Sequence, residues 1–163
     1  MYYLHAYARG VDKRDTFLDP IDYKTFLLAL TLSVRPNAPS ASIYLDWLTR
    51  GLVPGNLTAS KIKSLFGQPN LTIISAVLMP NHFHIQLSQD KPEKAGRFFR
   101  RLITSYTKYF NARYQREGHL FSSKVKTVGF ANDEQNVAIQ AGNWIIEDND
   151  TVRRHSTLSL ASF

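Results

Sequence analysis

Two strand-like runs, at residues 71–79 and 82–88, are separated by only Pro80 and Asn81. Both runs are rich in β-branched and other apolar residues, which is typical of strands. The short Pro-Asn connection predicts a tight turn between them. This pair of joined strands constrains the fold of the chain more than any other feature.

The second run opens with His82 and His84 on either side of Phe83. Because residues i and i+2 of a strand share a face, both imidazoles should point one way and Phe83 into the core. Neutral imidazole is the commonest metal-ligating side chain, so the pair predicts half of a divalent-metal site. A histidine-rich strand end without a ligand stays open as the alternative. His5, on an earlier strand-like run, could face the same site, although a lone strand histidine is more often packed or solvated.

The composition limits the class of protein. A length of 163 residues with 44% hydrophobic residues fits one domain with a substantial core. The absence of cysteine excludes disulfides and thiolate zinc sites, so a metal must use nitrogen and oxygen ligands. The first residues do not resemble a signal peptide, and no apolar run is long enough to cross a membrane. We therefore expect a soluble, cytoplasmic protein.

The net charge of +7 is concentrated between Lys94 and Lys126. Basic residues interleaved with aromatic ones suit nucleic acid, because cations neutralise phosphates and rings stack on bases. A solvated basic helix face is the alternative. The cations expected to contact phosphates are Arg97, Arg100, Arg101, Lys108, Arg113, Lys124 and Lys126.

The rest of the chain alternates strand-like and helix-like patterns. In the long helix expected before the last strand, apolar residues recur at helical spacing and place Tyr106 in the core. The expected segments are a strand at 2–9, a helix at 20–35, short helices at 43–48 and 60–66, strands at 71–79 and 82–88, a helix at 91–114, a strand at 121–130 and a last helix from 132 through Ile145.

This order predicts an α+β fold in a single domain over residues 1–163. The expected architecture is a ferredoxin-like antiparallel sheet with helices on one face, an insertion at about 37–70 after the first helix, and a C-terminal helix. The insertion could contact a partner or DNA, or be a structural elaboration. Such a fold hosts many functions, so it does not identify one.

Several blocks of the chain, taken in order, resemble blocks of a known family. They are residues 8–10 with 17–19, 22–27, 78–85, and 105–114 with 118–121. Together they cover most of the chain outside the insertion, and the block at 78–85 contains the two histidines. On these blocks the chain resembles the single-tyrosine HUH transposases, particularly the REP-associated tyrosine transposases.

The resemblance implies a homodimer that binds hairpins in single-stranded DNA and cleaves the strand beside them. In the family a helix-borne tyrosine attacks the phosphodiester, forms a 5′-phosphotyrosine and leaves a 3′-OH that later rejoins ends. A phenolate suits this reversible step because it is a usable nucleophile and a tolerable leaving group. The resemblance also implies that His82 and His84 hold Mg²⁺ or Mn²⁺, which would polarise the scissile phosphate.

The last segment departs from the family pattern. Trp144 stands where the resemblance places the nucleophilic tyrosine, and no tyrosine follows Tyr114. Indole cannot attack phosphorus. Asp148, one helical turn past Trp144, stands where the family has its third metal ligand, and a carboxylate there would complete a site of two histidines and one oxygen. A surface aspartate is the open alternative, and Glu147 is a less well-placed substitute.

Three hypotheses about function remain. The favoured one is a relic that binds hairpin-containing DNA and has lost strand transfer because Trp144 replaced the nucleophile. The second is an active metal-dependent DNA endonuclease or strand transferase that uses Tyr109 or Tyr114, less favourably Tyr106, or water. The third is a protein-interaction domain that does not bind DNA.

Overall fold

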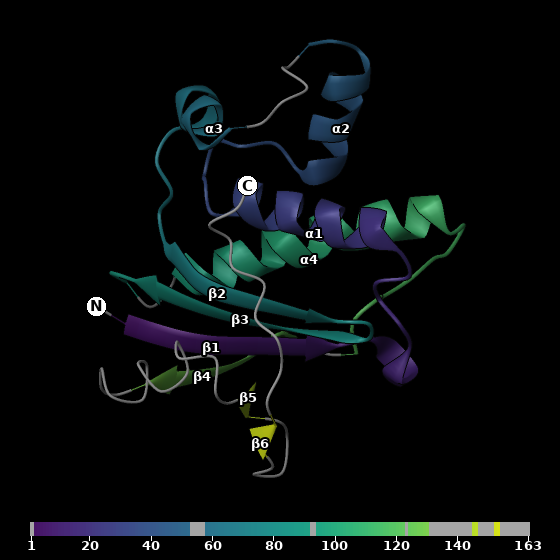
Figure 1. Ribbon diagram of the computed structural model, residues 1–163, viewed down its shortest axis with the longest axis vertical. Helices are drawn as coiled ribbons and strands as arrows, with labels where there is room; N and C mark the ends of the chain where they lie inside the picture. Colours follow the sequence, from purple (N-terminus) through teal and green to yellow (C-terminus); the bar gives the residue numbers. More distant parts are fainter. Residues whose placement is uncertain are drawn as a thin grey trace.

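The computed structural model describes residues 2–52, 58–91, 94–122, 124–130, 145–146 and 152–153. The fold is α+β, with a four-stranded antiparallel sheet packed with four helices (Figure 1). The elements, in order, are β1 (Tyr2–Arg9), the 3-10 turn η1 (Val11–Lys13), α1 (Pro20–Ser33), α2 (Ala41–Thr49), α3 (Ala59–Phe66), β2 (Thr72–Met79), β3 (His82–Gln89), α4 (Lys94–Arg113), β4 (Lys126–Phe130), β5 (Ile145–Ile146) and β6 (Val152–Arg153).

The strand order in the main sheet is β2-β3-β1-β4, so β3 is a central strand between β2 and β1. The tight β2–β3 connection predicted from Pro80 and Asn81 is confirmed. The backbone of this turn is held from the side. The Pro80 carbonyl accepts hydrogen bonds from the amides of Thr16 and Phe17 at 2.7 and 2.9 Å, and the Asn81 carbonyl accepts one from Gly10 at 2.8 Å.

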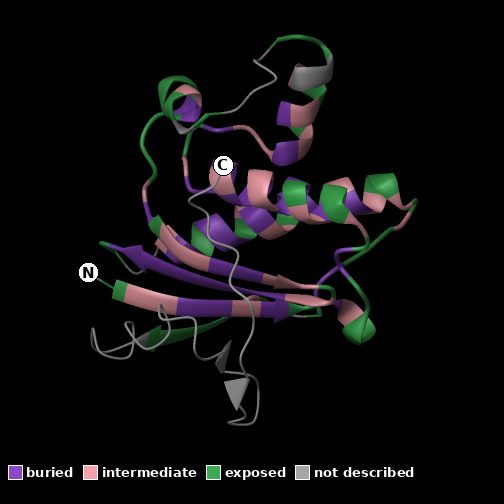
Figure 2. Ribbon diagram, in the orientation of Figure 1, coloured by how far each residue is buried: buried purple, intermediate pink, exposed green. Residues whose placement is uncertain are grey.

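One face of the sheet is covered by α1 and α4, with α2 and α3 on the outer side of these two helices (Figure 1). The core lies between sheet and helices, as the burial pattern of the central strands shows (Figure 2). Phe83 is fully buried there, with its ring centroid 5.1 Å from that of Phe26 in α1. Tyr106 of α4 packs edge-on against the same Phe26 at 5.0 Å, which confirms its predicted place in the core.

The insertion at 37–70 forms the two predicted helices and packs on α4. Tyr44 of α2 is fully buried, and its ring meets that of Phe66 from α3 edge-on. The Ala41 amide donates to Ser105 Oγ of α4 at 2.8 Å. These contacts make the inserted helices part of the same packed unit.

The C-terminal helix expected through Ile145 is contradicted at its last residue. Residues 131–144 lie outside the described part of the chain, and Ile145–Ile146 form strand β5, paired antiparallel with β6. β-branched side chains fit a paired strand better than a helix, which accounts for the difference.

The strand expected at 121–130 starts later, at Lys126. In the described residues, no helix is both long enough and apolar enough to span a membrane.

A buried carboxylate joins the start of α1 to the last turns of α4. Asp22 is fully buried and accepts hydrogen bonds from the Leu18 amide at 2.8 Å, Tyr109 Oη at 2.8 Å and Tyr114 Oη at 2.9 Å. Arg113 completes the cluster at 3.1 Å from Asp22 Oδ1. A buried charge is tolerated only when it is paired and hydrogen-bonded, and this cluster meets both conditions.

We expect Asp22→Asn to lower the free energy of unfolding by about 3 kcal/mol, because it removes the buried charge and turns an amide group toward hydrogen-bond donors. Urea denaturation measures this change. Asp90→Asn is the matched control, because Asp90 pairs with Lys94 in a largely exposed ion pair and should change stability little. Equal effects of the two substitutions would contradict the role assigned to Asp22.

Candidate functional site

The face of the sheet opposite α1 and α4 carries a polar set of side chains. Alternation along β3 and β1 places these side chains there, because Phe83, Ile85 and Ala6 point to the helix side. We call this surface the histidine face. Its side chains from the two central strands include His82, His84, Gln86, His5, Tyr7 and Arg9.

His82 and His84 lie side by side on the histidine face, as their spacing predicts. Their ring centroids are 5.2 Å apart and the ring planes are turned by 80°. Strand pairing sets their neighbours on β1. His84 is opposite Tyr7 and His82 is opposite Arg9, and Tyr7 is in turn opposite Lys126 of β4. Two cations from different strands therefore share the face with the two imidazoles.

His82 receives its orientation from the residue before it. Its Nδ1 lies 2.6 Å from Asn81 Oδ1. A carboxamide oxygen only accepts hydrogen bonds, so Nδ1 is the donor and carries the ring proton in the neutral imidazole. The lone pair is then on Nε2, the nitrogen that a metal ion requires.

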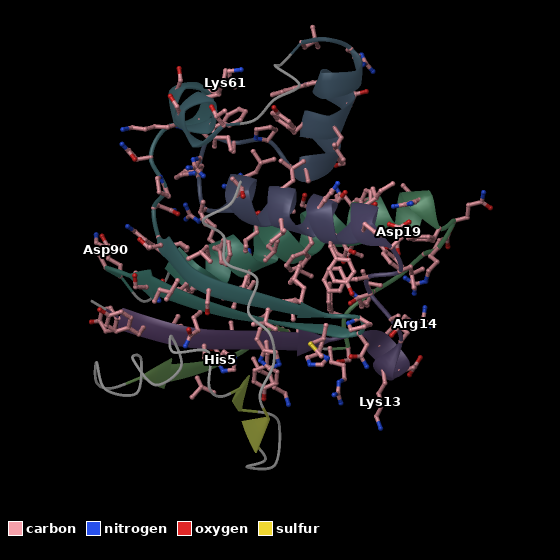
Figure 3. All side chains as sticks on the ribbon, in the orientation of Figure 1. His5, Lys13, Arg14, Asp19, Lys61 and Asp90 are labelled. Carbon is pink, nitrogen blue, oxygen red and sulfur yellow. The ribbon has the colours of Figure 1, made fainter. Side chains whose placement is uncertain are left out.

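His84 is held by a second histidine from β1. His5 Nε2 lies 2.9 Å from His84 Nδ1, and both side chains are at most 5% exposed. Burial lowers the pKa of His5 to about 4, so this imidazole is neutral at pH 7. Figure 3 shows His5 on the side of the sheet away from the helices, whereas Asp19 lies at the start of α1. From the sequence, His5 is a weaker candidate than His82 and His84, but the structure places it in contact with His84.

The two imidazoles fit a divalent cation in part. Each has its Nδ1 in a hydrogen bond, which is the arrangement found when Nε2 binds a metal. Among the described residues, no group of three histidine, cysteine, aspartate or glutamate side chains could hold an ion. The other site residues expected from the sequence, Asp148, Glu147 and Trp144, lie outside the described part of the chain.

The three tyrosines weighed as nucleophiles lie on the helix side of the sheet. The hydroxyl of Tyr106 donates to the Thr16 carbonyl at 2.6 Å, and burial raises the pKa of Tyr106 far above its usual value. Tyr109 and Tyr114 both donate to Asp22, and burial raises the pKa of each. The sheet separates these hydroxyls from the histidines, and raised pKa values disfavour the phenolate. The geometry therefore gives a nucleophilic role no support.

The seven cations expected to contact phosphates differ in what they bind. Arg101 donates to the carbonyls of Arg35 and Ala38, both at 2.6 Å, and so holds the connection from α1 to α2. Arg113 pairs with Asp19 and Asp22. These two guanidiniums serve the fold. Besides Arg113, the expected cations that are exposed are Arg97, Arg100, Lys108, Lys124 and Lys126.

A groove of about 840 Å³ runs between α4 and the edge of the sheet at β4. Leu4, Phe99 and Ile103 contribute to its apolar wall, and Arg100 and Lys124 also line it. Leu4 and Phe99 belong to the helix-side core, so this groove is separate from the histidine face. The sequence pattern did not indicate it, because its walls come from segments distant in the chain.

The raised pKa of Tyr114 makes the free energy of unfolding depend on pH in the alkaline range. Burial, followed by the hydrogen bond to Asp22, raises the pKa of Tyr114 from 10.0 to about 12. Between these two values the unfolded chain releases a proton that the folded chain keeps, so the free energy of unfolding falls as pH rises. We expect Tyr114→Phe to be less stable at pH 7 but to lose less stability over this alkaline window. Urea denaturation at a series of pH values measures both slopes, and parallel slopes would contradict the raised pKa.

No family model and no curated protein matches this chain. Its function is therefore inferred from the residues and contacts of the site. Two imidazoles on one face of a central strand, each with its Nδ1 hydrogen-bonded, are the observation that a proposed function has to explain.

Proposed function

We propose that this protein binds hairpin-containing single-stranded DNA through a divalent-metal site of the HUH type, as a homodimer related to the single-tyrosine HUH transposases. The observation that carries the proposal is the pair His82 and His84, side by side with both Nδ1 atoms hydrogen-bonded. The metal would be Mg²⁺ or Mn²⁺. Asp148 is its proposed third ligand on the family resemblance alone, because Ile145–Ile146 form a strand and the helical spacing from Trp144 does not apply there. The resemblance of the sequence blocks supplies the family and the homodimer.

The topology supports this proposal. Two β-α-β halves with the strand order β2-β3-β1-β4, all antiparallel, match the ferredoxin-like arrangement that the family resemblance implies. In this arrangement the two histidines occupy a central strand, where the backbone is held by pairing on both sides. A fold of this kind is compatible with many functions, so the histidine pair and the charges decide the proposal.

The chain's own residues would bind and orient a phosphate on the histidine face. His82 and His84 would hold the metal, which when bound supplies positive charge that polarises a phosphate oxygen. Arg9 and Lys126 lie on the same face and add charge that attracts the DNA backbone. The Lys126 ammonium sits 5.5 Å from the centre of the Tyr7 ring, beside His84. The face thus combines a phosphate site with an aromatic ring that a nucleobase can contact.

We further propose that strand transfer has been lost. Trp144 stands at the position expected for the nucleophile. The hydroxyl of Tyr106 donates to the Thr16 carbonyl, and those of Tyr109 and Tyr114 donate to Asp22. A phenol that donates to a buried carboxylate is a poor source of phenolate. Binding without cleavage is the function that these placements support best.

The test is intact-mass spectrometry after incubation with Mn²⁺ and a pool of hairpin-bearing single-stranded DNA. We expect retention of DNA in a parallel binding assay and no covalent protein–DNA adduct. An adduct would overturn the loss of strand transfer, and peptide mapping would locate the nucleophile. Absence of any binding at low salt would overturn the DNA-binding function itself. His82→Ala and His84→Ala should each abolish the part of the affinity that depends on Mn²⁺.

Cations that contact DNA and cations that hold the fold should have different effects on the salt dependence of DNA binding. Replacing Arg9 and Lys126 of the histidine face together by glutamine should weaken binding and flatten the plot of log affinity against log salt, by about 0.7 for each lost phosphate contact on a single strand. Arg101→Gln is the matched control, because this guanidinium binds backbone carbonyls. It should lower the melting temperature and leave the slope unchanged. A slope that responds only to Arg101 would contradict the assignment.

A further inference from the structure

The hydrogen bond between His5 and His84 has a specific geometry. The two nitrogens are 2.9 Å apart, the ring planes differ by only 8° and the ring centroids are 5.1 Å apart. The centroid separation is close to the nitrogen–nitrogen distance plus the two centroid-to-nitrogen lengths. Both nitrogens therefore lie near the line that joins the centroids, and the rings are nearly coplanar. This is the arrangement of a linear hydrogen bond between two imidazoles.

The same geometry shows how His5 acts on the site. Two ligands of one cation direct their lone pairs to a common third point, whereas His5 Nε2 and His84 Nδ1 are directed at each other. A cation shared by these two nitrogens does not fit between them. His5 therefore acts on His84 through the proton that lies between the rings.

The position of that proton decides what His84 can bind. A neutral imidazole carries one N–H and one lone pair. When Nδ1 of His84 donates to His5, Nε2 of His84 presents its lone pair. When His5 donates instead, Nε2 of His84 carries the proton, and neither nitrogen of His84 can accept a metal ion.

We propose that His5 is a positioning residue whose Nε2 accepts a hydrogen bond from His84 Nδ1 and so holds His84 in the tautomer that presents Nε2 on the histidine face. His82 is held in the same tautomer by Asn81. The two histidines thus receive matching tautomers from different sources, one from the adjacent residue and one from a strand 79 positions away. The pairing of the two rings is independent of the proposed function, but the choice of His84 as the donor and the consequence for metal affinity both rest on it, because only this direction leaves Nε2 of His84 for a metal.

Packing holds the pair in place. His5 and His84 are 4% and 5% exposed, and the ring of Tyr7 lies 5.9 Å from His5 and 5.8 Å from His84, measured between centroids. Strand pairing sets Tyr7 opposite His84 and His5 opposite Gln86. A buried donor without a partner is costly, so removal of the His5 acceptor should release His84 from a single tautomer.

The direct test is long-range ¹H–¹⁵N correlation on the metal-free full chain labelled at its histidines. The five histidines are few enough to assign by single substitutions. We expect His84 to carry its proton on Nδ1. His5→Phe, which keeps a ring and removes the acceptor, should abolish this signature. His5→Gln should keep it, because the side-chain oxygen of glutamine reaches about as far as Nε2 and accepts a hydrogen bond.

The tautomer measurement has two outcomes that overturn the proposal. One is a proton on Nε2 of His84 in the unmodified protein. The other is an unchanged His84 signature in His5→Phe. The unmodified protein alone decides the first outcome, so the proposal remains falsifiable if His5→Phe does not fold. His119→Ala is the control, because His119 is exposed and lines the groove on the helix side.

Calorimetric titration with Mn²⁺ separates this proposal from the proposed function. We expect His5→Phe to weaken Mn²⁺ binding about 10–100-fold, as loss of a hydrogen bond to a ligating histidine does, with a smaller loss in His5→Gln and none in His119→Ala. Equal affinities of the unmodified protein and His5→Phe would overturn the role of His5 and leave the metal site standing. No Mn²⁺ binding by the unmodified protein, together with the Nδ1 signature, would overturn the metal site and support the role of His5 in the tautomer.

Discussion

Burial of β3 on both of its faces is the constraint on which the rest of the structure depends. Every residue of this strand is buried except His82, which is intermediate. On the helix side the requirement is met by apolar packing, as with Phe83 against Phe26. On the histidine face the strand carries polar side chains, and a buried polar group is stable only when it is hydrogen-bonded. The pair His84–His5 and the bond from Ser75 Oγ to Gln86 Oε1 meet that requirement in part, because Gln86 Nε2 is buried with no hydrogen-bond partner among the described residues.

The sheet consequently separates two polar clusters with different roles. On the helix side, Asp22 collects the hydroxyls of Tyr109 and Tyr114 and joins α1 to α4. On the opposite side, the histidines gather with Arg9 and Lys126. A tyrosine of α4 cannot serve the histidines without crossing the sheet. This separation is the physical basis for assigning the tyrosines to stability and the histidines to binding.

Much of the fold could be predicted because the relevant signals are local. Period-two alternation and the Pro80-Asn81 turn indicated the β2–β3 hairpin, and helical spacing of apolar residues placed Tyr106 in the core. The functional use of charged residues was harder to predict. Arg101 and Arg113 resemble surface cations in the sequence, but their partners come from α1 and the residues that follow it, more than sixty positions earlier.

The sequence by itself determined that His82 and His84 share a face and that Phe83 enters the core, because the geometry of a strand leaves no other arrangement. It also placed Tyr106 in the core, because this residue follows the helical spacing of the apolar residues in its helix. Only the tertiary structure decided that β1 lies beside β3 and brings His5 onto His84. Strand order and register are set by the packing of all elements together, and residues 79 positions apart carry no local signal of their contact.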